Sequence, residues 1–66
     1  MQFTMKQARQ YSGLTQEEIA EKMDMHRDTY RKLETNPEKA TVEQARLFSQ
    51  IVGIGLDQIF FAGEST

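Results

Sequence analysis

The sequence predicts an all-α domain, and three observations support this prediction. Apolar residues recur at helical spacing, whereas no stretch shows the period of two that marks a strand. At three places a Thr stands three residues before Gln or Glu, which is the pattern of a helix capping box. These pairs are Thr4 with Gln7, Thr15 with Glu18, and Thr41 with Gln44. Gly13, Pro37 and Gly53 are natural helix stops. We therefore expect five helices in one domain, residues 1–66, with 63–66 as a frayed tail.

The composition limits the class of protein. The chain of 66 residues has no cysteine, which excludes disulfides and thiolate metal sites. No apolar run reaches the length of a membrane span, and the N-terminus lacks the apolar core of a signal peptide. We expect a cytoplasmic domain that is stabilised by packing, alone or with dimerisation. We expect no cofactor, metal, small-molecule ligand or membrane partner.

The stretch Gln16–Leu33 has the pattern of two short amphipathic helices joined by a tight turn. The first of these helices follows its cap at Thr15. The turn is expected at 24–26, where Asp24 tolerates a positive φ better than most residues. The second helix is expected at about Arg27–Glu34, and the rest of the chain is arranged to hold it.

The other helices are expected on either side of this pair. The first helix runs from Met5 to Tyr11 or Ser12. After the third helix, Asn36 can take a left-handed cap, and 37–40 form a short loop. A fourth helix follows Thr41 and ends at Gly53. Leu56–Phe61 is expected to form a fifth, short, apolar helix or turn.

The helix Arg27–Glu34 has a narrow apolar stripe and a broad polar face. The stripe contains Tyr30 and Leu33, and we expect Tyr30 in the core rather than on the surface as a stacking platform. The polar face is formed by Arg27, Asp28, Arg31, Lys32 and Thr35, with Thr29 at its edge. Such a helix is typically half buried and half presented to a partner.

The charge distribution points to a local basic site. The formal net charge is −2 and the pI is about 5.2, which taken alone argues against a nucleic-acid partner. However, three of the eight basic residues share the polar face of Arg27–Glu34, while Glu17, Glu18 and Glu21 gather on the preceding helix. The net charge thus lowers nonspecific affinity without excluding a basic interface.

The segment LTQEEIAEKMDMHRDTYRKLE resembles the helix-turn-helix of the phage Cro/cI-like repressors, the XRE family. The similarity extends from about Met5 to Phe60 and includes the ending GIGLDQIF. It implies a compact five-helix, lambda-repressor-like domain whose third helix enters the major groove of DNA. Two features depart from the family pattern: His26 replaces a small residue, and the loop ETNPEKAT offers only Lys39 as a basic residue. The chain resembles a Cro-type stand-alone protein or an excised DNA-binding domain.

The resemblance places base contacts at Arg27, Asp28 and Lys32, and the polar face adds Thr29 and Arg31. Arg27 can donate two hydrogen bonds to guanine O6 and N7. Arg31 and Lys32 can contact bases or phosphates, and Thr29 can contact a thymine methyl group. Asp28 can accept from cytosine N4, but we favour a role in orienting Arg31 or Lys32, since a carboxylate near phosphates is costly unless it is paired.

Phosphate contacts are expected from four residues: Thr15, Gln16, His26 and Lys39. By resemblance, Gln16 binds a backbone phosphate and braces the first residue of the third helix. The backbone N–H groups at the start of the second helix favour an anion on physical grounds as well. Thr15 can bind phosphate and cap its helix at once. His26 has no second histidine and no cysteine with which to form a metal site.

Two further roles follow from the resemblance. Arg9 and Glu34 match a pair that forms a buried salt bridge in several family members. Leu56, Gln58 and Phe61 lie where a dimer interface is expected. The alternative for Phe61 is a partly exposed side chain without a partner.

The predicted function is a sequence-specific transcriptional regulator, a Cro-like repressor of bacterial or phage origin that binds double-stranded DNA. A homodimer, formed at least on DNA, would place two recognition helices about 34 Å apart on a near-palindromic operator. The alternative is a protein-interaction module on the same fold, such as an antitoxin-like or anti-regulator partner, which the acidic pI favours. An enzyme is not expected, because paired histidines, cysteine and a glycine-rich phosphate loop are all missing.

Overall fold

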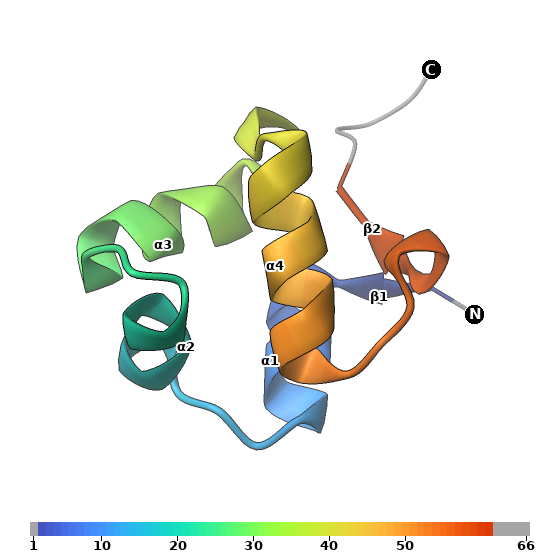
Figure 1. Ribbon diagram of the computed structural model, residues 1–66, viewed down its shortest axis with the longest axis horizontal. Coiled ribbons are helices and arrows are strands. Elements are labelled where there is room, and N and C mark those ends of the chain that lie inside the picture. Colours follow the sequence, from blue (N-terminus) through green and yellow to red (C-terminus); the bar gives the residue numbers. More distant parts are fainter. Residues whose placement is uncertain (1, 62–66) are drawn as a thin grey trace.

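Four α-helices make up most of residues 2–61, the part of the chain that this computed structural model describes. They are α1 (Met5–Tyr11), α2 (Gln16–Lys22), α3 (Arg27–Thr35) and α4 (Val42–Val52). Figure 1 shows α2 and α3 to one side of α4, with two short strands to the other. No helix in this part of the chain is long and apolar enough to cross a membrane. The predicted frayed tail, 63–66, lies outside the described residues.

All three predicted capping boxes are confirmed. The hydroxyl oxygens of Thr4, Thr15 and Thr41 each accept from the backbone N–H three residues later, at 3.1 Å. In each box the Gln or Glu side chain accepts from the Thr N–H in return. The predicted stops at Gly13 and Gly53 are confirmed as well, because both have a positive φ, of 77° and 73°. A complete capping box thus fixes where each of three helices, α1, α2 and α4, begins.

The predicted count of five helices is wrong, and of the two forms expected for Leu56–Phe61, a helix or a turn, the structure has a turn followed by a strand. Leu56–Gln58 form a single 3₁₀ turn (η2), and Ile59–Phe60 form a strand, β2, that pairs in parallel with β1 (Phe3–Thr4). A stretch of this length is too short to form a stable isolated helix, and Ile59 and Phe60 favour strands. The partner strand lies at the other end of the chain, so no local pattern signalled the pairing. The domain is therefore mostly helical rather than all-α.

The predicted left-handed cap at Asn36 is also wrong. Asn36 has φ −130° and ψ 73°, because a following proline disfavours helical backbone at the residue before it. The expected loop begins with a 3₁₀ turn, η1 (Pro37–Lys39). The stop itself is correctly placed, since α3 ends at Thr35.

The turn between α2 and α3 has the predicted backbone. Asp24 has a φ of 57° and is the non-glycine residue with positive φ among those described. Met25 is half-buried and packs against the core, and its N–H donates to the Ala20 carbonyl at 2.9 Å. Through these contacts of Met25, the short turn fixes the position of α3 relative to α2.

The core lies between the four helices and contains the apolar stripe of α3. Its largest fully buried side chains are Met5, Ile19, Tyr30 and Phe48. The Tyr30 and Phe48 rings stack with centroids 6.3 Å apart. The predicted core position of Tyr30 is therefore confirmed, and one face of α3 is fixed to the body of the domain.

Candidate nucleic-acid interface

The outer face of α3 is polar and open to solvent. The five residues predicted to contact bases are all exposed: Arg27, Asp28, Thr29, Arg31 and Lys32. On the opposite face, Tyr30 is fully buried and Leu33 is 7% exposed. The helix thus exposes three cationic side chains on one face, while its opposite face is packed into the core.

Asp28 lies between two nitrogen-bearing side chains. Its Oδ1 is 4.0 Å from Arg31 Nη1, and its Oδ2 is 3.9 Å from His26 Nδ1. All three side chains are more than 60% exposed, so these contacts contribute little to stability in water. They do place the carboxylate beside Arg31, as the orienting role requires.

His26 is the N-cap of α3. Its Nδ1 accepts a hydrogen bond from the backbone N–H of Asp28 at 3.1 Å. This bond leaves Nε2 as the N–H group of the neutral ring. Sequence reasoning placed His26 at the start of the helix but missed the cap, because Ser, Thr, Asp and Asn are the usual residues there.

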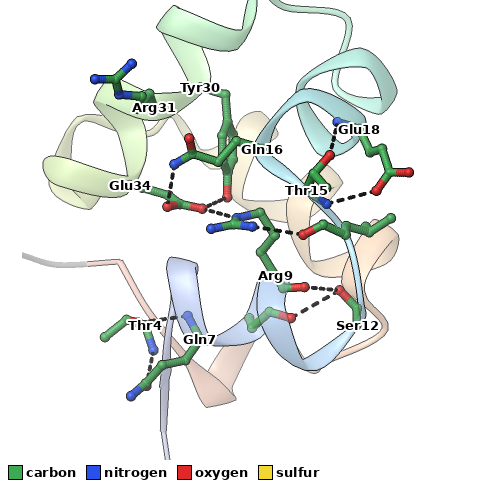
Figure 2. Close-up of polar contacts among 12 residues, drawn as sticks. Thr4, Gln7, Arg9, Ser12, Thr15, Gln16, Glu18, Tyr30, Arg31 and Glu34 are labelled. Carbon is green, nitrogen blue, oxygen red and sulfur yellow. Dashed lines mark hydrogen bonds and ion pairs between the residues drawn. The ribbon is translucent and has the colours of Figure 1, made fainter.

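A buried polar cluster joins α1, α2 and α3 (Figure 2). Glu34 Oε2 accepts from Arg9 Nε at 2.5 Å and from the Tyr30 hydroxyl at 2.6 Å. Glu34 Oε1 accepts from Gln16 Nε2 at 3.0 Å. Arg9 also donates from Nη1 to the Leu14 carbonyl at 2.9 Å. We call these four side chains, Arg9, Gln16, Tyr30 and Glu34, the carboxylate cluster.

The carboxylate cluster stabilises the charged form of Glu34. Burial by itself raises the pKa of the Glu34 carboxyl, but hydrogen bonds from Arg9, Tyr30 and Gln16, with the charge of Arg9, bring the pKa below its ordinary value. Burial, followed by the hydrogen bond to Glu34, raises the pKa of the Tyr30 hydroxyl. At neutral pH the centre is therefore a carboxylate facing a guanidinium and a neutral phenol.

Apart from His26 at the start of α3, the predicted phosphate contacts fall into two groups. Thr15 and Gln16 line one shallow hollow at the start of α2, and Arg27 of α3 lines the same hollow. Thr15 is exposed and its hydroxyl caps α2. Gln16 is half-buried because its amide belongs to the carboxylate cluster. Lys39 is exposed on η1, beyond the C-terminal end of α3.

Acidic residues lie closer to the candidate interface than the sequence indicated. Glu17, Glu21 and Asp24 line a hollow together with His26 and Arg27. Helix periodicity separates the charges of α2 from those of α3 along the chain but does not show that the two sets meet. Arg27 therefore stands at a boundary between the acidic side of α2 and the polar face of α3.

The residues predicted for a dimer interface belong to the segment 56–61, which lies on the other side of α4 from α3 (Figure 1). Leu56 is 41% exposed on η2, and Gln58 is also exposed. Phe61 is half-buried, and its ring meets Phe48 edge-on at a centroid distance of 6.1 Å. Part of the Phe61 surface is therefore already covered by the core.

The fold and the exposed face of α3 define a helix-turn-helix DNA-binding domain. A family model described as helix-turn-helix matches residues 5–59. The chain belongs to this family, the Cro/C1-type helix-turn-helix or XRE family, whose members are DNA-binding, non-enzymatic domains. Comparison with curated proteins and with solved structures gave no match.

Proposed function

We propose that this XRE-type regulator is a repressor that binds a near-palindromic operator as a dimer, with α3 in the major groove. One observation carries the proposal: α3 exposes a continuous polar face with three cations while its opposite face is locked into the core. A helix fixed in this way can enter a groove without losing its position. Occupancy of the operator would then exclude other proteins from it.

Base recognition is assigned to the outer face of α3. Arg27 is suited to guanine, because its fork matches the O6 and N7 acceptors. Arg31 and Lys32 reach bases or phosphates from the next turn, and Thr29 contacts a thymine methyl group. Asp28 orients Arg31, an assignment that its 4.0 Å separation from Arg31 Nη1 supports.

Phosphate contacts hold the domain on either side of the groove. Thr15 and Gln16 act from the start of α2, His26 through Nε2, and Lys39 from η1. Contacts of this kind set the register of the protein on the duplex and carry no sequence information directly.

Dimerisation through Leu56, Gln58 and Phe61 would set the spacing of the two half-sites at about 34 Å. The position of the segment 56–61 on the other side of α4 from α3 supports this assignment, because an interface there and the face of α3 proposed to read bases do not compete for the same surface. We place the protein in the cytoplasm of a bacterium, encoded by the host or by a phage.

Selection of duplexes from a random DNA pool tests the proposal. We expect enrichment of a near-palindromic sequence, followed by binding whose affinity falls steeply with salt, because phosphate contacts release counterions. If no sequence is enriched, the operator function is refuted.

The second candidate function is a protein-interaction module. The acidic hollow formed by Glu17, Glu21 and Asp24, together with a net charge of −2, favours this candidate. Absence of enrichment, together with absence of DNA binding that falls with salt, would support this candidate against the operator function.

A further inference from the structure

The side chain of Gln16 is already held before any DNA is bound. Its Nε2 donates to Glu34 Oε1 at 3.0 Å, and the Glu34 side chain is only 7% exposed. Figure 2 shows the amide nitrogen of Gln16 turned toward Glu34, while Arg31 of the same helix as Glu34 points away. The first residue of α2 is thus tied to the last turn of α3.

Glu34 is itself held from the other side. Arg9 and Tyr30 both donate to Oε2, which leaves Oε1 as the acceptor for Gln16. Arg9 also binds the Leu14 carbonyl, two residues before Gln16. Arg9 therefore links Glu34 to the backbone just before α2. Because both oxygens of the Glu34 carboxylate accept hydrogen bonds, this group has little freedom to rotate.

The chemistry of an amide gives this arrangement a consequence. A glutamine amide has two N–H groups in one plane, and Glu34 accepts from one of them. With that N–H held, rotation of the amide group is restricted, which limits the directions in which the second N–H can point. Gln16, which is half-buried, also lines the shallow hollow that contains Thr15 and Arg27, so part of this residue borders the side proposed for DNA.

We propose that Glu34 is a positioning residue for DNA binding, which holds the Gln16 amide so that its second N–H is ready to donate to a phosphate. This inference rests on the proposed function, in which Gln16 contacts the DNA backbone. Ordering a long side chain only at the moment of binding weakens affinity by about two- to tenfold, and the carboxylate cluster removes that penalty in advance.

A comparison of two backgrounds tests the proposal. In the second background Arg9→Met, Tyr30→Phe and Glu34→Leu replace the cluster partners of Gln16 with apolar side chains, so no charge is left buried and unpaired. Affinity for the selected duplex is measured with Gln16 and with Gln16→Ala in each background. We expect Gln16→Ala to weaken binding about two- to tenfold more in the native background. Exposed Gln50 is the matched control, and Gln50→Ala should cost the same in both.

Equal losses from Gln16→Ala in the two backgrounds would overturn the positioning role, because Gln16 would then act without Glu34. No loss in the native background would overturn it as well, since Gln16 would have no contact to prepare. Both results require a duplex that the protein has selected. Failure to select any duplex refutes the proposed function instead, so the two failures are distinct.

A second measurement needs no variant that could fail to fold. The two side-chain amide protons of Gln16 are followed by NMR in the native chain, with and without the selected duplex. We expect the proton that bonds Glu34 to keep its chemical shift and its slow exchange, while the other shifts on DNA binding. If both protons move and the slow exchange is lost, the amide leaves Glu34 to bind DNA, and the proposal is wrong.

Discussion

Replacing Arg9 with alanine is expected to destabilise the fold more than any change on the outer face of α3. The substitution removes the cation beside Glu34, whose side chain is 7% exposed, while the Arg9 side chain itself is 11% exposed. The carboxylate then stays buried without an opposite charge. The Leu14 carbonyl loses its donor at the same time.

The size of the effect follows from the contacts that remain. Loss of one partner from a buried ion pair costs about 3–5 kcal/mol. Tyr30 and Gln16 still donate to Glu34, so we expect a loss near the lower limit, about 3 kcal/mol. A domain of this size has a free energy of unfolding of about 3–10 kcal/mol, so the variant should be partly unfolded or close to it.

Urea denaturation monitored by circular dichroism measures this loss. With a slope of about 1 kcal/mol per molar urea, the midpoint should fall by about 3 M. Arg46→Ala on α4 is the matched control, because this arginine is exposed and should change stability by less than about 0.5 kcal/mol. A loss below about 1 kcal/mol in the free energy of unfolding for Arg9→Ala would refute the reasoning, since a buried carboxylate without an opposite charge should destabilise the fold by more than that.

The double variant Arg9→Met with Glu34→Leu separates charge from packing. It removes both charges and keeps apolar volume in their place, which is often neutral for stability. We expect it to be more stable than Arg9→Ala alone. If it is equally unstable, the loss comes from shape rather than from the unpaired carboxylate.

Four further predictions concern the interface and the cluster. Arg27→Ala should weaken specific DNA binding by about 1–3 kcal/mol, measured by mobility shift, with nearly unchanged thermal unfolding. Lys39→Ala should weaken binding to all sequences alike and reduce the slope of log affinity against log salt by about one. His26→Ala should lower the free energy of unfolding by about 1 kcal/mol through loss of the N-cap, which urea denaturation measures. The folded pKa of Glu34 lies below its unfolded value, so its contribution is complete above about pH 4.3 and is lost as pH falls through the folded pKa. Acid titration of unfolding should therefore show a shallower loss for Arg9→Met with Glu34→Leu than for the native chain.

The helix starts could be predicted because their signals are local. Each capping box is complete within four consecutive residues, so the sequence contains both donors and both acceptors. The C-terminal strand could not be predicted in this way. Ile59–Phe60 become a strand only because Phe3–Thr4 lie beside them in the fold, and no local pattern links the two ends of the chain.

In the candidate site, too, the features set within one helix could be predicted, and those that depend on contacts between helices could not. Helical periodicity alone separated the exposed face of α3 from its buried stripe, because both are set by positions within one helix. The contact between Gln16 and Glu34 joins residues 18 positions apart, and the expectation for Gln16 directed it outward to a phosphate. Similarly, the acidic residues of α2 meet Arg27 only through the angle between two helices.

The charge distribution finally indicates how such a domain can discriminate between DNA sequences. One of the eight basic residues, Arg9, is committed to Glu34 inside the fold and adds little to the outer field. Glu17, Glu21 and Asp24 line a hollow together with Arg27, and under the proposed function they would repel phosphates that approach on that side. Weak electrostatic attraction lowers nonspecific affinity, because that affinity comes almost entirely from phosphate contacts. Under the proposed function, the base contacts assigned to Arg27, Arg31 and Lys32 would then supply a larger share of the total, so a mismatched site would lose a larger fraction of its binding free energy.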